Sequence, residues 1–374
     1  MTVTIQPKSH EGTSRLKAPL AQSSPGTELL PLTEPTSPAI RLSSVQADFR
    51  AALLQRLRAG EYRLEAQPLC ECGAAGSVQL AAKDRFGIPV GTVLCTACGL
   101  VRTSPRLATQ NLPSFYDEIY HGLHLGVPQP DPSMALFRAG QGMAIHDYVA
   151  DLLPAGALRV AEIGCGTGQV LREFRASAVG CHVELVGCEY AHAFVAAGME
   201  AGTDIRRGGV ETLSGSGPFD LVILSHVVEH FPAPVADLSS LRQLGDDRTI
   251  YYVEVPGLLA IHHKPEYGYR LDRYLTLAHT YHFSLATLTA TMARAGFVRL
   301  RGDEGVRSLF RMSAPTQPPP DRAAARNTLA YVKWLRSSQR LRLARARQSL
   351  NSAGGRLLRR LFGERRYREL RSKR

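Results

Sequence analysis

The chain contains the stretch Val160-Ala161-Glu162-Ile163-Gly164-Cys165-Gly166-Thr167-Gly168. Its apolar start predicts a buried strand, and its three glycines at alternate positions predict a tight turn that opens a helix. Glycines allow a ligand to approach the backbone N–H groups closely, because no side chain stands in the way. The stretch therefore predicts an α/β sheet with a nucleoside-like ligand at this turn.

A second apolar strand, residues 183–188, ends in Glu189. An acid at the end of the second strand, about 20 residues after a glycine turn, is placed to accept hydrogen bonds from a ribose diol. Further strands are expected at 204–205, 219–225, 249–255, 297–300 and 308–312. Strands that alternate with loops and helices at this spacing favour a doubly wound, mostly parallel sheet.

Glu162 lies two residues before the first glycine, and the third glycine comes one residue earlier than in a dinucleotide-binding turn. This E-x-G-x-G-x-G form, together with the segment from Asp220 to His230, resembles the class I S-adenosylmethionine (SAM) methyltransferases. The resemblance spans about residues 110–313 and implies a Rossmann-like seven-stranded sheet with SAM as cofactor. An unrelated nucleotide-binding Rossmann domain is the alternative, but several segments agree with the methyltransferases in order and spacing.

The resemblance also implies the cofactor contacts. These are expected from Glu162, Gly164, Cys165, Gly166, Thr167, Gly168, Glu189, Tyr190, Val210, Glu211 and Ser225. Gly209 departs from the family pattern, since an acid often stands there before the adenine contact. Tyr116 and Tyr120 are candidates to cover the cofactor, although aromatic residues at helical spacing are as often core residues.

Histidines gather where the methyl acceptor is expected. Residues 278–284 resemble an E-H-x-x-Y-F-S segment of sugar methyltransferases, with Ala278 and His282 departing from it. His279 is the first candidate for the base that takes a hydroxyl proton, and His230 is the second. Glu229 either assists them or holds the loop by hydrogen bonds, and a divalent metal on Glu229, His230 and His279 is a further option.

Four cysteines precede the methyltransferase-like region: Cys70, Cys72, Cys95 and Cys98. The Cys-x-x-Cys pair with a following glycine is typical of a zinc knuckle, whereas Cys-x-Cys is less regular. We interpret the four as a structural zinc site in a small ribbon-like module, the alternative being reduced core cysteines. The residues after Cys95 resemble the zinc-binding leader of sugar and polyketide-associated methyltransferases.

Composition divides the chain further. Residues 321–374 hold 17 Lys and Arg but only 3 Asp and Glu, which gives this tail a net charge of +14. The whole chain has a net charge of +12, so residues 1–320 carry a net charge of −2. We expect a disordered leader over 1–44, a short helix and zinc module over 45–107, the methyltransferase domain over 108–314, and a Pro-rich linker with a basic helical tail over 315–374. The tail is solvated, lies on an anionic membrane, or binds an acidic partner or nucleic acid.

The resemblance implies an enzyme that methylates a small-molecule or glycan acceptor, with O-methylation of a sugar-type hydroxyl as the leading reaction. C-methylation of a nucleotide-linked keto sugar is the alternative. An RNA-binding or RNA-methylating protein that uses the basic tail is the alternative from another class. Cysteines without a disulfide framework and the lack of a secretory signal predict a cytoplasmic protein, with peripheral contact at the inner membrane face as an option.

Overall fold

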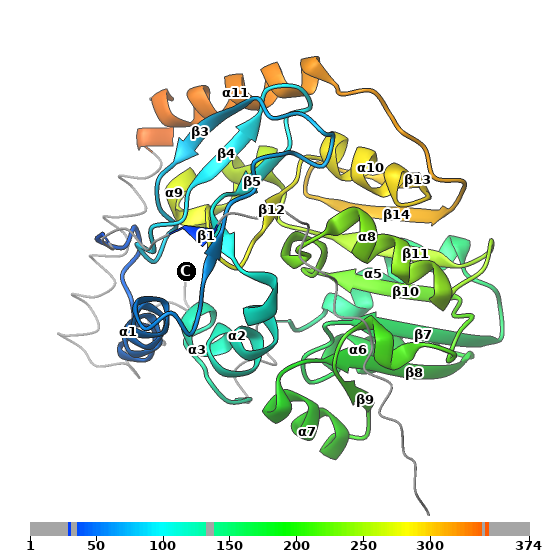
Figure 1. The fold of residues 1–374 in the computed structure, drawn as a ribbon. Helices are drawn as coiled ribbons and strands as arrows, with labels where there is room; N and C mark the ends of the chain where they lie inside the picture. Colours follow the sequence, from blue (N-terminus) through cyan, green and yellow to red (C-terminus); the bar gives the residue numbers. More distant parts are fainter. Residues whose placement is uncertain (1–28, 31–35, 132–137, 339–340, 344–374) are drawn as a thin grey trace, which may run out of the picture.

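A seven-stranded sheet forms the centre of the computed structural model, which describes residues 29–30, 36–131, 138–338 and 341–343. The strand order is β13-β14-β11-β10-β7-β8-β9 (Figure 1). Its strands are β7 (Ala157–Ile163), β8 (His182–Glu189), β9 (Asp204–Arg207), β10 (Leu221–Ser225), β11 (Ile250–Glu254), β13 (Phe297–Gly302) and β14 (Arg307–Met312). The strands from β9 to β11 are parallel, while β14 and β13 run antiparallel. The seven-stranded sheet predicted from the sequence is confirmed.

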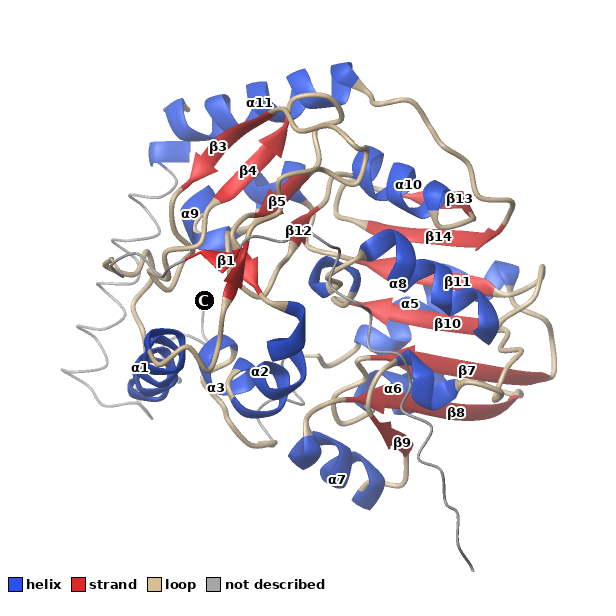
Figure 2. Ribbon diagram, in the orientation of Figure 1, coloured by secondary structure: helices blue, strands red, loops and turns tan. Residues whose placement is uncertain are grey.

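Helices cover both faces of this sheet (Figure 2). Along β10, Val222 and Leu224 belong to one hydrophobic core, and Leu221 and Ile223 belong to the other, because successive strand residues point to opposite faces. One core is closed by α8 (Pro234–Ser240) and α10 (Leu285–Arg294), and the other by α5 (Gln141–Val149), α6 (Gln169–Ser177) and α7 (His192–Glu200). A central strand buried on both faces is the signature of a doubly wound sheet.

A second, antiparallel sheet has the order β12-β5-β4-β3. It consists of β3 (Ser77–Ala81), β4 (Thr92–Cys95), β5 (Val101–Thr103) and β12 (Tyr281–His282). The sequence predicted a ribbon of two hairpins from the cysteine spacing alone. The structure has instead one sheet whose edge strand β12 comes from the chain between α9 (Leu271–Tyr274) and α10, so residues some 180 positions apart pair across it.

The N-terminal helix α1 (Ser44–Arg58) begins with a capping box between Ser43 and Gln46, and it ends two residues before Gly60. It packs with α2 (Leu112–Glu118) and α3 (Tyr120–His124) around a third core. A small sheet joins β1 (Leu29–Leu30), β2 (Leu64–Glu65) and β6 (Arg106–Leu107).

Part of the leader that was expected to be disordered is ordered. β1 pairs with β2, and the Thr36 and Ala39 N–H groups donate to the carbonyls of Gly87 and Arg85. The remaining leader residues, 1–28 and 31–35, lie outside the described residues.

The helix α11 (Arg322–Ser337) begins at Asp321, whose carboxylate accepts hydrogen bonds from Ala323 N and Ala324 N. It lies across the second sheet (Figure 1), and a Cβ on Gly99 would come within 2.8 Å of the Ala325 nitrogen. The predicted helix after the Pro-rich segment is therefore present as packed structure. Most of the basic tail, 344–374, lies outside the described residues. The membrane and nucleic-acid hypotheses depend on these residues, so the structure does not test them.

Short 3₁₀ turns connect these elements: η1 (Thr109–Asn111), η2 (Ala150–Leu152), η3 (Val210–Leu213), η4 (Val228–His230), η5 (Leu241–Leu244), η6 (Leu258–His263) and η7 (Pro265–Tyr267). Among the described helices, none is long and apolar enough to cross a bilayer.

Candidate functional site

The glycine turn joins β7 to α6, as predicted. Gly164, Gly166 and Gly168 all have positive φ, at +66°, +56° and +70°. This left-handed conformation costs a residue with a side chain about 1–2 kcal/mol, which explains why glycines alternate here. A Cβ added to Gly166 would meet nothing within 4 Å, so the turn has open space above it. A Cβ on Gly164 would come within 2.8 Å of a Val227 methyl, so the turn lies against the loop that follows β10.

Glu162 is fully buried beneath this turn. Neither of its carboxylate oxygens has a hydrogen-bond partner among the described residues. Burial raises the pKa of Glu162, the positive charge of Arg138 opposes the rise and the negative charge of Glu189 adds to it, which brings the pKa to about 8. A carboxyl group buried without a partner is costly, so the site favours the arrival of a cation or a hydrogen-bond donor.

Glu189 ends β8 and reaches back to the glycine turn. Its Oε2 accepts a hydrogen bond from Gly166 N at 3.1 Å, and its Oε1 accepts one from Ala191 N at 2.9 Å. Burial raises the pKa of Glu189, while these backbone donors oppose the rise. A carboxylate has more acceptor positions than these two bonds use, so it retains the capacity to accept from hydroxyl groups.

The predicted adenine contacts lie in η3. The Glu211 Oε1 accepts a hydrogen bond from Gly209 N at 2.8 Å, which closes this turn on itself. A Cβ on Gly209 would come within 2.5 Å of the Tyr190 hydroxyl. It would also come within 2.7 Å of Glu211 Oε2, so these two side chains leave no room for a larger residue at position 209. Val210 begins the turn and is half-buried.

The other predicted cofactor residues differ in their burial and in their hydrogen bonds. The Cys165 thiol is buried, since a Cβ on Gly187 would meet its sulfur at 2.4 Å, so only its backbone faces the turn. The Thr167 carbonyl accepts from Arg172 Nη1 at 2.7 Å. Ser225 ends β10, and its Oγ accepts a hydrogen bond from Gln141 Nε2 at 2.7 Å. Gln141 was not predicted, and no motif in the sequence marks it.

Three predicted acceptor-side residues meet just beyond β10. The Glu229 Oε1 lies 3.8 Å from His230 Nε2 and 4.0 Å from His279 Nε2. The two imidazole rings lie 5.0 Å apart and nearly perpendicular. Glu229 is 1% exposed, and neither of its oxygens is hydrogen-bonded within the described part of the chain. Burial lowers the pKa of both histidines, that of His279 well below its usual value.

Two side chains that the sequence did not predict as partners of the histidines form hydrogen bonds with them. The Tyr116 hydroxyl and His230 Nδ1 form a hydrogen bond at 3.0 Å, and Tyr116 also stacks on Tyr190 with ring centroids 6.4 Å apart. The Thr103 hydroxyl donates to the His279 carbonyl at 2.7 Å. His282, which departs from the family segment, is buried 5.8 Å from the His279 ring. Tyr120 contacts the His230 ring edge-on, so both predicted tyrosines lie at the acceptor side.

The four cysteines also meet. Cys70 and Cys72 precede β3, Cys95 ends β4, and Cys98 lies in the turn between β4 and β5. Their sulfurs all lie within 4.8 Å of one another, with 3.6 Å between Cys70 and Cys98 and 3.7 Å between Cys72 and Cys95. A tetrahedron with Zn–S bonds of about 2.3 Å has edges of about 3.8 Å. The donor set and its spacing therefore fit a four-thiolate zinc site with no open position.

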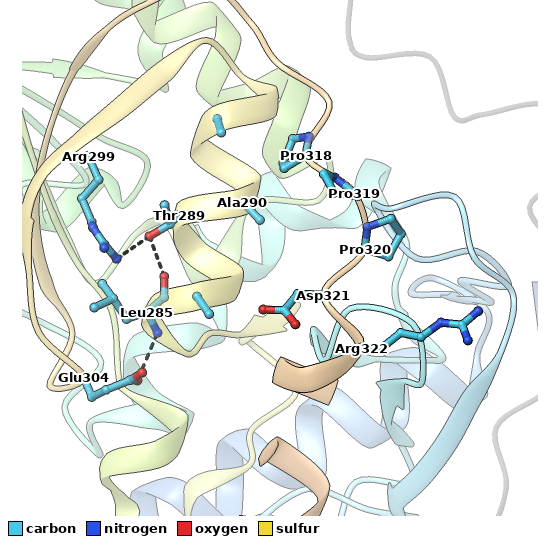
Figure 3. Close-up of a pocket in the computed structure, with 12 residues that line it drawn as sticks. Leu285, Thr289, Ala290, Arg299, Glu304, Pro318, Pro319, Pro320, Asp321 and Arg322 are labelled. Atoms are coloured by element: carbon cyan, nitrogen blue, oxygen red, sulfur yellow. Dashed lines mark hydrogen bonds between the residues drawn. The ribbon is translucent and has the colours of Figure 1, made fainter. Parts of the chain in front are cut away.

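A pocket of about 760 Å³ lies elsewhere, between α10 and residues 318–322 (Figure 3). None of the predicted site residues lines it. Several of its polar side chains already have partners: Arg299 Nη1 donates to Thr289 Oγ1 at 2.9 Å, and Glu304 accepts from Leu285 N at 3.1 Å. The chemistry-bearing residues thus lie at the ends of β7, β8 and β10 and not in this pocket.

Comparison with known proteins agrees with this geometry. Residues 135–300 match the family model described as a methyltransferase domain. No curated protein matches the sequence. Similar solved structures include a SAM-dependent methyltransferase from Mesorhizobium loti (16% identity, 46% of this chain and 99% of that chain, TM-score 0.36). Another is the magnesium protoporphyrin IX methyltransferase from Synechocystis with bound S-adenosylhomocysteine (19% identity, 55% and 100%, TM-score 0.37).

A third is a SAM-dependent methyltransferase from Thermotoga maritima, described as a possible histamine N-methyltransferase (18% identity, 48% and 92%, TM-score 0.37). At these TM-scores the likeness says nothing about the acceptor. The expectation of a methyltransferase therefore depends on the match to the family model and on the geometry of the site.

Proposed function

We propose that this chain, a SAM-dependent methyltransferase, transfers a methyl group to a hydroxyl of a sugar-type acceptor. One observation carries the placement of the two substrates. Tyr116 stacks on Tyr190, which follows the ribose candidate Glu189, and its hydroxyl is hydrogen-bonded to His230. A single side chain therefore connects the cofactor side of the site to the acceptor side.

The residues around the glycine turn have the properties that SAM binding needs. The open face of Gly166 admits the cofactor, and Glu189 accepts hydrogen bonds from the ribose hydroxyls. The buried carboxyl of Glu162, which has no hydrogen-bond partner among the described residues, can give up its proton and accept hydrogen bonds from the ammonium group at the methionine end of SAM. A buried carboxyl whose oxygens are left without hydrogen bonds in the described part of the chain supports a role in binding.

SAM supplies an activated methyl group on its sulfonium, and the chain must align the acceptor and take its proton. As the acceptor oxygen bonds to the methyl carbon, the carbon–sulfur bond breaks and the hydroxyl proton leaves. His279 is the first choice for the group that receives this proton, and His230 is the second. Glu229 Oε1 lies 3.8 Å from His230 Nε2 and 4.0 Å from His279 Nε2, where its charge would stabilise a protonated imidazole.

The four cysteines bind a structural zinc ion in this proposal. The zinc holds the turn between β4 and β5, and β5 in turn pairs with β12, which directly follows His279 and Thr280. The metal therefore acts at a distance, by fixing the sheet that supports the acceptor side. A closed four-thiolate site has no position for a substrate.

Calorimetric titration with S-adenosylhomocysteine tests the cofactor part. The wild-type protein should bind it, Glu189→Gln should bind at least tenfold more weakly, and Glu184→Gln should be unaffected. Glu184 is the matched control because it is an exposed acid on the same strand β8. Wild-type affinity in Glu189→Gln would refute the assigned role.

A panel of sugar acceptors with labelled SAM, followed by mass spectrometry, tests the acceptor part. Methyl label on oxygen supports the proposal, and label on carbon from a nucleotide-linked keto sugar would replace it by C-methylation. RNA is included in the same panel, and methyl label in RNA alone would exclude both O-methylation and C-methylation of sugars.

A further inference from the structure

We propose that Glu229, His230 and His279 form a binding site for one divalent transition-metal ion, distinct from the four-cysteine cluster. Their ligand atoms all lie within 4.8 Å of one another. Two imidazoles and one carboxylate are the ligand set of catalytic zinc and non-haem iron sites, which keep positions open for a substrate oxygen. The inference rests on the proposed function for its chemistry, but metal binding itself can be measured without any acceptor.

The Glu229 carboxylate is the first argument for a cation. It is 1% exposed, and neither oxygen has a hydrogen-bond partner among the described residues. A carboxylate so far from water is unfavourable unless it pairs with a positive group or coordinates a metal.

The orientation of the two imidazoles is the second argument. The Tyr116 hydroxyl occupies Nδ1 of His230 at 3.0 Å, which leaves Nε2 directed toward Glu229. A metal-bound histidine usually has such a partner on its other nitrogen, because this fixes the ring and its tautomer. For His279 the main chain is held, because the Thr103 hydroxyl donates to the His279 carbonyl and the Thr103 N–H donates to the neighbouring Thr280 carbonyl. The His279 Nδ1 has no hydrogen-bond partner among the described residues, so of the two histidines it is His230 that has such an outer partner.

The distances from Glu229 need only a small contraction. Neighbouring ligand atoms around a cation with bonds of about 2.1 Å lie about 3.0–3.4 Å apart. Here the Glu229 Oε1 lies 3.8 Å and 4.0 Å from the two Nε2 atoms. Side-chain shifts of about half an ångström would therefore bring Glu229 to the expected distance from both histidines, whose ligand nitrogens lie within 4.8 Å of each other.

His226 offers the competing explanation for the buried carboxylate. Its Nδ1 lies 3.5 Å from the same Oε1, and its side chain is 42% exposed. A protonated His226 would neutralise Glu229 without a metal. The two explanations differ in a measurable way, because only the metal site predicts that all three ligands are needed for a cation to bind.

A bound cation would change how the acceptor is activated. An acceptor hydroxyl on an open position would lose its proton more readily, because the metal lowers its pKa. His279 would then act as a ligand, while the proton would go to solvent or to a buffer base. Adjacent sugar hydroxyls would suit two open positions, so the site would favour a diol.

The test is a calorimetric and optical titration of the full-length, zinc-replete protein with Co²⁺. We expect one further equivalent of cobalt with no cobalt–thiolate absorption. Glu229→Gln and His279→Asn should each lose this equivalent, and Tyr116→Phe should weaken it about tenfold through the lost outer hydrogen bond. His226→Gln and the exposed control His263→Gln should keep it.

The inference is overturned if no cobalt binds beyond the zinc equivalent, if thiolate bands accompany binding, or if Glu229→Gln binds cobalt like wild type. S-adenosylhomocysteine binding, measured on the same samples, shows that each variant is folded. It also separates the two proposals: cofactor binding without cobalt leaves the methyltransferase assignment intact, whereas cobalt binding without cofactor would refute the assigned cofactor site and leave the metal site standing.

Discussion

The Thr103 hydroxyl donates a hydrogen bond to the carbonyl of His279 at 2.7 Å, across 176 positions of sequence. The Thr103 N–H also donates to the Thr280 carbonyl at 2.9 Å. Thr103 ends β5 in the sheet that carries the cysteine cluster. The main chain at the histidine is therefore held by the N-terminal part of the protein and not by the seven-stranded sheet.

Thr103→Val should move His279 and slow methyl transfer. The substitution keeps the shape but leaves a buried carbonyl without its hydroxyl donor, at a cost of about 1–3 kcal/mol. We expect kcat to fall about tenfold while S-adenosylhomocysteine affinity stays constant. Thr291→Val is the matched control, because Thr291 is equally buried and donates to the Thr287 carbonyl within α10. An equal loss of activity in both variants would contradict the positioning role.

Removal of Cys98, a ligand of the proposed zinc site, should uncouple the two halves of the site. Cys98→Ser is expected to lower zinc content, measured by mass spectrometry, and to lower the melting temperature, because metal-binding energy is folding energy at such sites. Acceptor turnover should fall with it, whereas cofactor binding on the seven-stranded sheet should persist. Cys181→Ser, a half-buried cysteine outside the cluster, should change neither quantity. Undiminished zinc in Cys98→Ser would disprove the four-thiolate site.

Glu162 should make stability depend on pH. Its pKa is raised from 4.5 to about 8 in the folded protein, so between these values the unfolded chain is ionised while the folded chain keeps the proton. Stability then falls as pH rises through this window, by up to about 1.4 kcal/mol per pH unit, and this contribution is absent in Glu162→Gln. Urea unfolding from pH 5 to pH 8 measures the slope. Identical slopes in both proteins would show that Glu162 does not titrate in this range.

Tyr116→Phe should separate binding from turnover. The variant keeps the stacking on Tyr190 but loses the hydrogen bond to His230, so we expect cofactor affinity within twofold of wild type and a kcat lower by about 1–2 kcal/mol of activation free energy. Tyr148→Phe is the control, since its exposed hydroxyl bonds only the Arg307 carbonyl among the described contacts. A loss of cofactor affinity without a change in kcat would show that Tyr116 acts in cofactor binding and not on the methyl acceptor.

The sequence predicted the glycine turn and the strands because both depend on local rules. Positive φ at Gly164, Gly166 and Gly168 follows from sterics within a few residues. Apolar runs identify strands such as β10 wherever both faces are buried. The sequence failed for the cysteine module, where β12 joins from residues 281–282, because an edge strand of two residues has no periodicity to detect.

By itself, the sequence determined the central sheet, the glycine turn with its acidic neighbours, and the candidate histidines and cysteines. Only the tertiary structure decided which of these meet. Glu229 approaches His279 across fifty residues, Thr103 reaches its carbonyl, and Tyr116 connects Tyr190 to His230. Backbone sterics and hydrophobic periodicity act over a few neighbouring residues, whereas contacts between distant side chains depend on strand order and packing that no local pattern records.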